Sequence, residues 1–357
     1  MTQSRDGGSS AMTTAAAKRQ RLANILASRR GGASSGLLIA KRPSDVDELP
    51  LSYAQEGIWF VEQLNPQARV YNLIIAVEFE GELDEAALGK AVQELVKRHA
   101  PLRTTFQEVD GNPTQRIKAD ASPTIEFVDL VENEGAVSEA RLEQFLEEQR
   151  VAAFDFGLGP PVRVSLVRAS DSLHILALCM HHILIDGWSF SILQSELKQL
   201  YDAFASGETA GLEPVVLDSA DLAWWQRRWL KTEGFNRRLE RCKDRLLGAT
   251  ALELATDHRR PATPSFDGAS ESLILDPECR RTLSAVSSGH GGTEFVTLLA
   301  IFLLLLHRYS GQTDVVIGSP VTLRSRAEID DVVGLLINMG VLRVELSDNP
   351  DFPSLLV

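Results

Sequence analysis

The chain has 357 residues, enough for two lobes that each bury a core, and a net charge of −13, which repels nucleic acid. Its three cysteines lie far apart without metal-binding spacing, so neither a disulfide framework nor a zinc site is expected. The longest apolar run, at 296–306, is too short to cross a bilayer and predicts a helix buried on most sides. Because the N-terminus has no secretory signal, we expect a cytoplasmic protein without a membrane partner.

Residues 1–42 are predicted to form a flexible basic leader. They carry eight Lys and Arg residues against one Asp, a balance of +7 that leaves −20 for the rest of the chain. Leu22, Ile25 and Leu26 form a narrow apolar stripe on a short helix between residues 15 and 29. A helix of this length is marginal alone, so we expect it to dock on a partner or on the body of the protein.

Residues 43–210 mix strand and helix patterns and are predicted to form the first lobe. Strand-like runs occur at 71–81, 102–109, 162–169 and 173–182, and helical runs at 84–99, 137–153 and 188–205. Asp84 stands where the N-cap of the first helix is expected. Hairpin-like neighbours and crossovers both occur, which indicates an α/β fold with mixed sheets and flanking helices.

Residues 211–357 are predicted to form the second lobe, after a loop-like boundary near 207–217. The expected elements are a Trp- and Arg-rich helix at 219–247, a strand at 270–275, a helix that begins after Thr293, and strands at 314–321 and 335–346. No internal repeat of fixed period is present.

The run CMHHILIDGWS at 179–189 is the best candidate site. His181 and His182 end an apolar strand, and neighbouring strand residues point to opposite faces, so one imidazole can enter a cleft while the other packs in a core. Asp186 follows closely, and Gly187 admits backbone conformations that other residues resist. Two buried structural histidines are the alternative; a metal site is disfavoured because no third ligand has suitable spacing.

The segment HHILIDG resembles the HHxxxDG motif of the condensation domains of nonribosomal peptide synthetases, relatives of chloramphenicol acetyltransferase. Four further segments are similar to motifs of that family in the same order: LSYAQEGIWF, RHAPLRTTF, DLAWWQRRWL and the stretch at 314–343. Gly57, Ser219 and Leu323 depart from the usual residues, and LLINMG keeps only Asn338 of its motif. The resemblance implies a two-lobed fold of the chloramphenicol acetyltransferase type. Because family members continue beyond the equivalent of residue 357, we expect a C-terminally truncated domain with an incomplete second lobe.

The resemblance also implies a function: amide bond formation between a donor acyl or peptidyl thioester and an acceptor aminoacyl thioester. Both would be held on carrier proteins, the donor upstream and the acceptor downstream, beside an adjacent adenylation domain. The 4′-phosphopantetheine arm would come from these carriers, and the chain itself would bind no cofactor and no metal. A stand-alone coenzyme A-dependent acyltransferase and a non-catalytic recruitment module are the alternatives.

The same resemblance assigns roles to the site residues. His182 would accept the proton of the attacking amine or position that amine, and the Gly187 amide is a candidate oxyanion donor. His181 is expected to pack at the strand end. Asp186 is expected to make a structural ion pair with Arg324, or with Arg103 as second choice. The candidates for lining the substrate tunnel are Trp188, Ser189, Ser319 and Asn338. Trp188 could instead be a core aromatic residue, and Asn338 could instead cap a local backbone turn.

Overall fold

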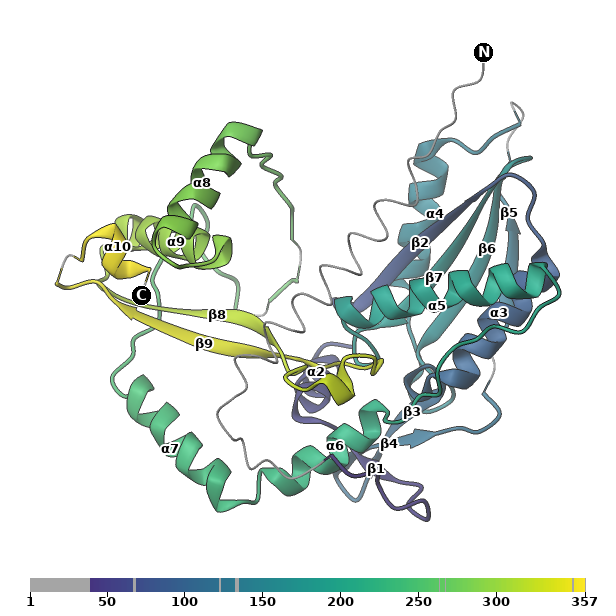
Figure 1. Cartoon of the computed structure of the whole chain (residues 1–357), viewed down its shortest axis with the longest axis horizontal. Helices are drawn as coiled ribbons and strands as arrows, with labels where there is room; N and C mark the ends of the chain where they lie inside the picture. The colour runs from purple at the N-terminus through teal and green to yellow at the C-terminus, as the bar shows by residue number, and fades with distance from the viewer. Residues whose placement is uncertain are drawn as a thin grey trace.

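A computed structural model describes residues 39–66, 69–121, 123–131, 135–262, 264–266, 268–348 and 350–356. The helix expected between residues 15 and 29 lies outside these ranges. Figure 1 shows the first half of the chain gathered around one sheet, with the later elements arranged beside it.

The first half is built on a four-stranded sheet in the order β2 (Asn72–Glu80), β7 (Leu173–His181), β6 (Val162–Ser170) and β5 (Ile125–Asp129). Neighbours are antiparallel except β5 and β6, which are parallel. The strand β7 lies in the interior of this sheet, and its last seven residues are all buried. The predicted mixed sheet is therefore confirmed, and its central strand ends at the histidine pair.

Helices cover both faces of this sheet (Figure 1). The helices α3 (Glu85–Arg98) and α5 (Gly187–Ala205) pack side by side on the face that carries Leu176 and Leu178. The helix α4 (Glu139–Val151) packs on the opposite face against Val167 and Ile175. Because side chains alternate along a strand, β7 contributes to both cores. Asp84 caps α3 as predicted, since its carboxylate accepts a hydrogen bond from the Ala87 N–H at 2.9 Å.

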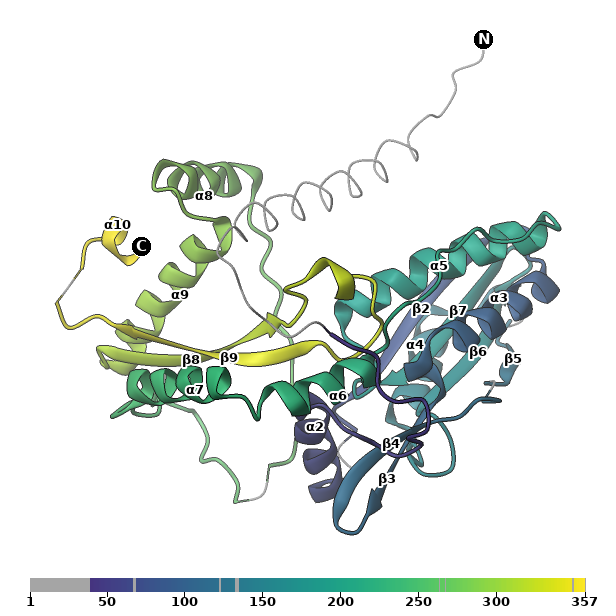
Figure 2. The same ribbon diagram turned by 60° about the horizontal axis from the view of Figure 1, so that its bottom comes forward.

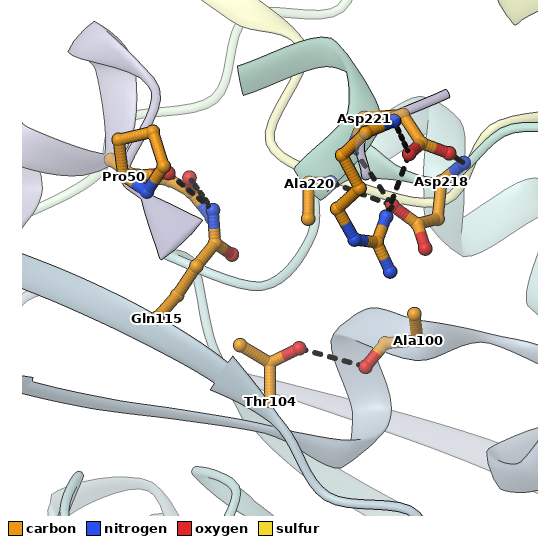
Figure 3. Close-up of polar contacts among 9 residues, drawn as sticks. Pro50, Ala100, Thr104, Gln115, Asp218, Ala220 and Asp221 are labelled. Carbon is orange, nitrogen blue, oxygen red and sulfur yellow. Dashed lines mark hydrogen bonds and ion pairs between the residues drawn. The ribbon is translucent and has the colours of Figure 1, made fainter. Parts of the chain in front are cut away.

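A smaller sheet in the order β1 (Leu49–Pro50), β4 (Asn112–Ile117) and β3 (Thr104–Val109) lies below the first. The 3-10 turn η1 (Ala100–Arg103) precedes β3, and α2 (Tyr53–Leu64) follows β1. Figure 3 shows two contacts that fix this region: the Gln115 amide donates to the Pro50 carbonyl, and the Thr104 hydroxyl donates to the Ala100 carbonyl, each at 2.8 Å.

The later elements are mostly helical. They are α6 (Ser219–Trp229), α7 (Glu233–Leu246), α8 (Pro277–Gly289), α9 (Glu294–Ser310), β8 (Asp314–Thr322), η2 (Ala327–Ile329), β9 (Ile337–Glu345) and α10 (Phe352–Leu355). The strands β8 and β9 pair with each other as an antiparallel ribbon. A small core of four buried residues joins this ribbon to α9: Leu303, Leu306, Val315 and Leu346.

Three expectations for the second half are wrong. The helix predicted at 219–247 is two helices, because Thr232 caps a new one at α7. No strand forms at 270–275, where Leu273 and Ile274 are 86% and 92% exposed and have no strand beside them to pair with. The apolar run at 296–306 buries only one side of α9, because the ribbon and its neighbours cover only that side.

The N-terminus of α6 is tied to the start of the described chain. Figure 3 shows Asp218 and Asp221 in a reciprocal capping arrangement at this helix end. The Arg42 guanidinium bridges both carboxylates, at 2.6 Å from Asp218 Oδ1 and 2.8 Å from Asp221 Oδ1. Ile39 packs on the neighbouring apolar cluster. Residues 39–42, which the leader was expected to include, therefore lie against α6.

Among the described residues, no single helix is long and apolar enough to cross a membrane. The helices α8 and α9 together have the length and composition of one span, but they meet at 102°.

Candidate active site

The histidine pair stands where β7 leaves the sheet. The His181 N–H donates to the Pro161 carbonyl at 3.0 Å and the His182 N–H donates to the Tyr71 carbonyl at 2.8 Å, so the residues directly before β6 and β2 hold this end. His181 is buried between the rings of Tyr71 and Phe156, whereas His182 is half-buried. The structure thus separates the two imidazoles as strand alternation predicts.

The His182 ring makes no hydrogen bond with any described residue, and its Nδ1 atom is buried without a partner. Buried polar atoms are usually satisfied, so an unpaired one needs an explanation. Because Nδ1 is buried, a substrate can meet this ring only from its Nε2 side.

A short turn leads from the histidines to α5. The Leu184 N–H donates to the His181 carbonyl at 3.0 Å, and residues 183–185 are buried. Asp186 then caps α5, because its Oδ1 accepts from the Ser189 N–H at 2.8 Å. The spacing of HHILIDG therefore places a helix N-terminus one turn beyond the imidazoles.

The structure pairs Asp186 with Arg324 rather than with Arg103. Arg324 Nη1 donates to Asp186 Oδ2 at 2.6 Å, and both side chains are almost completely buried. The Leu336 N–H donates to the same oxygen at 3.0 Å. Arg103 instead donates to the carbonyls of Val96 and Lys118, which fixes the end of α3. Asp186 therefore joins α5 to the segment between β8 and β9.

Ser189 was expected to line a substrate tunnel, and this expectation is wrong. The residue is 0% exposed. Its hydroxyl lies 2.7 Å from Asp186 Oδ1, 3.1 Å from Arg324 Nη2, and 2.9 Å from both the carbonyl oxygen and the amide nitrogen of Gly334. A residue three positions after an N-cap faces the capping side chain, which is the signal that could have placed Ser189 in this cluster.

Gly187 does not need its glycine for backbone geometry, contrary to expectation. It is the first residue of α5, its φ is outside the left-handed region, and a Cβ added there would meet nothing within 4 Å. What the glycine provides is open space beside the turn that carries His182. The amide N–H at the first helical position also has no acceptor within the helix.

The remaining tunnel candidates lie on the surface or at its edge. Trp188 is 42% exposed and its indole N–H donates to the Asp330 carbonyl at 2.9 Å. Ser319 is half-buried on β8, opposite Gly340 of β9. Asn338 is exposed on β9, and its Oδ1 accepts from the Met339 N–H at 2.8 Å, so the local backbone contact is the one present.

Two residues of α2 reach the site. The LSYAQEGIWF motif includes Gln55 without showing its role, and no sequence pattern points to Glu62. Gln55 Nε2 donates to the Ile183 carbonyl at 3.2 Å, and Glu62 Oε2 lies 3.6 Å from His181 Nε2. Both are buried polar side chains on a helix that precedes the histidines by more than a hundred residues. Within the described part of the chain, no group of three or more His, Cys, Asp or Glu residues could hold a metal ion.

The comparisons with known proteins agree on one family. The condensation-domain family model matches residues 45–357. One component of the linear gramicidin synthase of Brevibacillus parabrevis is 40% identical over 309 residues, which are 86% of this chain and 6% of that protein. Phosphinothricin tripeptide synthetase of Streptomyces viridochromogenes is 35% identical over 319 residues, 89% of this chain and 29% of that protein. The chain thus spans only a small part of these relatives.

Solved structures share the fold. The X-domain from teicoplanin biosynthesis superposes with a TM-score of 0.78 at 26% identity, covering 89% of this chain and 69% of that one. The first condensation domain of the calcium-dependent antibiotic synthetase superposes with a TM-score of 0.72 at 21% identity, covering 87% and 73%. The expected fold type is confirmed. The chain belongs to the condensation-domain family, the amide-bond-forming acyltransferase domains of nonribosomal peptide synthetases.

Proposed function

We propose that this chain joins a donor acyl or peptidyl thioester to an acceptor aminoacyl thioester, each carried on the phosphopantetheine arm of a carrier protein. The observation that carries this proposal is the His182 ring, which stands at the end of β7 without a hydrogen bond to any described residue. The donor carrier lies upstream and the acceptor carrier downstream in an assembly that includes an adenylation domain. The helix expected at residues 15–29 of the basic leader is a candidate docking segment for the upstream partner.

The reaction needs a proton acceptor. The amine nitrogen of the acceptor attacks the thioester carbonyl carbon, a C–N bond forms, and the C–S bond then breaks to release the donor arm as a thiolate. The amine proton goes to the His182 imidazole and from there to the departing sulfur. By holding the amine against the carbonyl, the same ring also supplies orientation, which lowers the barrier.

The tetrahedral intermediate carries a negative oxygen that needs a donor. The Gly187 N–H is at the N-terminus of α5, where the helix dipole is positive and the amide has no intrahelical acceptor. Preorganised donors of this kind stabilise a developing oxyanion. Asp186 and Arg324 contribute indirectly, because their ion pair holds the start of α5 against the segment between β8 and β9.

The experiment is a condensation assay with carrier-bound donor and acceptor, followed by mass spectrometry of the product. We expect His182→Ala to lose most product, about 10²-fold or more, as for removal of a general base. Its melting temperature should stay near that of the wild type, because the ring makes no hydrogen bond with the described residues. His258→Ala, an exposed histidine elsewhere, is the matched control. An unchanged rate in His182→Ala would remove the residue from the chemistry.

A recruitment module is the alternative, and the comparisons as a whole do not favour it. The X-domain from teicoplanin biosynthesis, solved in a complex with OxyB, superposes on this chain with a TM-score of 0.80 at 26% identity. A wild-type chain that binds carriers but yields no product would support this candidate. Product from free coenzyme A thioesters, but not from carriers, would instead indicate a coenzyme A-dependent acyltransferase.

A further inference from the structure

The helix α2 buries polar side chains where an amphipathic helix normally buries apolar ones. Its two buried residues are Gln55 and Glu62. They are seven positions apart, two turns of helix, so they lie on one face. Burying an amide and a carboxylate is costly unless they find partners. Both are directed at residues 181–183, the segment that carries the histidine pair.

Gln55 and His181 together hold both backbone groups of Ile183. Gln55 Nε2 donates to the Ile183 carbonyl at 3.2 Å, and the Ile183 N–H donates to His181 Nδ1 at 3.2 Å. In a neutral imidazole only one nitrogen is an acceptor, so Nδ1 carries no proton and the proton resides on Nε2. The position of that proton thus decides whether the hydrogen bond from the Ile183 N–H to His181 Nδ1 can form and stabilise the turn after His182.

Glu62 is the group that faces the Nε2 proton. His181 Nε2 and Glu62 Oε2 are 3.6 Å apart, within ion-pair range but longer than a hydrogen bond, and both atoms are buried with no other partner in the described structure. Arg69 Nη1 lies 3.4 Å from the other oxygen, Oε1. The carboxylate therefore has one oxygen toward a cation and one toward His181.

Burial favours a neutral His181 ring. Burial lowers the pKa of His181, and the nearby His182 and Arg69 lower it further, while Glu62 opposes them. The charged and titratable groups that act on His181 are Glu62 on α2, Arg69 in the segment after α2, and His182 at the end of β7. A neutral ring has a choice between two tautomers, and a carboxylate beside Nε2 selects the one with its proton there.

We propose that Glu62 is a positioning residue that acts through His181 on His182. Its carboxylate selects the Nε2–H tautomer of His181, which leaves Nδ1 free to accept from Ile183 and fixes the turn on which the His182 ring stands. The inference rests on the proposed function, in which His182 handles the proton of the attacking amine. If the tautomer changes, an N–H on Nδ1 meets the N–H of Ile183, two donors face each other, and the turn must shift.

The test combines spectroscopy with kinetics on the complete chain. Nitrogen NMR of labelled histidine reports the His181 tautomer in the wild type, in Glu62→Gln and in Glu62→Asp. Gln63→Ala, an exposed neighbour on α2, is the control. We expect the Nε2–H tautomer in the wild type and in Gln63→Ala. In Glu62→Gln the amide can donate as well as accept, so a mixture of tautomers should appear, and Glu62→Asp, which keeps the charge, should lie between.

The kinetic expectation is a loss in kcat without a loss in binding. Glu62→Gln should lower kcat about tenfold, the size expected when a catalytic ring is misplaced rather than removed, with KM for either carrier unchanged. Its pH profile should keep the shape of the wild type, because His182 still handles the proton.

Two results would overturn the proposal: an Nδ1–H tautomer for His181 in the wild type, or a Glu62→Gln variant with wild-type kcat. Because the tautomer is measured without turnover, it decides the link between Glu62 and His181 separately. A wild-type chain that makes no product would instead overturn the proposed function.

Discussion

Asp186 is the residue on which most contacts of the site converge. Its carboxylate accepts from the N–H and hydroxyl of Ser189, from Arg324 and from the Leu336 N–H, all within 2.6 to 3.0 Å. Because these donors satisfy it from two sides, the carboxylate can remain in the interior. His182, four residues earlier, has no such partners. The two residues of one motif therefore have opposite functions: one holds the structure and the other is left for the substrate.

This contrast predicts opposite effects on stability. Asp186→Ala should lower the free energy of unfolding by about 3 to 5 kcal/mol, because it leaves the buried Arg324 charge uncompensated. Arg324→Ala should lower the free energy of unfolding by a similar amount, because it leaves the buried Asp186 carboxylate uncompensated. In chemical denaturation the double variant should be less damaging than the sum of the singles, with a coupling of about 0.5 to 3 kcal/mol. Strictly additive losses would show that the pair is not coupled in solution.

At the scale of elements, α5 is fixed at two points along its length. Its N-terminus is held by Arg324, and near its middle Glu196 joins it to the end of α3. Glu196 Oε2 lies 2.7 Å from His99 Nε2 and 2.8 Å from Arg98 Nε. Burial alone would raise the pKa of Glu196, but hydrogen bonds and charge from His99 and Arg98 outweigh it and hold the pKa below its ordinary value.

The pKa of Glu196 makes the α3–α5 junction sensitive to acid. A carboxyl with a depressed folded-state pKa stabilises the fold above its ordinary value of 4.5 and loses this contribution as the pH falls through the folded-state pKa. Glu196→Gln should therefore melt below the wild type at pH 7, and the difference should shrink once the pH is below 4.5. Glu143→Gln, an exposed carboxyl on α4, is the control for melting curves measured across pH. A difference that does not depend on pH would assign the effect to packing instead.

At the scale of the whole molecule, the ribbon of β8 and β9 reaches across to the first half of the chain. Figure 2 shows its connecting segment, residues 323–336, beside α5 and α6. The backbone at Gly334 packs closely on α6, because a Cβ added there would lie 2.5 Å from the Ser219 Cβ. The Trp188 indole and the Asp330 carbonyl form a further link. The site therefore depends on contacts between segments that are distant in sequence.

Substitutions at two glycines distinguish a position that is closely packed, Gly334, from one that has open space around it, Gly187. Gly334→Ala should lower the free energy of unfolding by about 1 to 3 kcal/mol, because α6 must move to admit the methyl group. Gly187→Ala adds the same group where nothing lies within 4 Å, so its melting temperature should be that of the wild type. Under the proposed function, Gly187→Ala should still slow product formation, because the substrate uses that space. Equal stability of the two variants would contradict the close packing of residues 323–336 on α6.

Sequence periodicity predicted the elements that form from local information. The strands β2 and β7 and the caps at Asp84 and Thr293 are as expected, because an N-cap and an alternating run act within a few residues. The strand expected at 270–275 has the right composition but no neighbour, and a strand needs a partner to satisfy its backbone. Strand composition was therefore insufficient where the partner was missing.

The sequence by itself determined the family, the separation of the two imidazoles and the helix that follows the HHILIDG motif, because each depends on short segments of the chain. Only the tertiary structure decided that Ser189 is buried in the Asp186–Arg324 cluster, and that Glu62 faces His181 across 119 positions of sequence. Hydrogen bonds and ion pairs between distant segments depend on how the elements pack, and no local pattern encodes that packing. The reactive residues of the candidate site thus come from one motif, whereas the positions of their side chains depend on contacts with α2, α5 and residues 323–336.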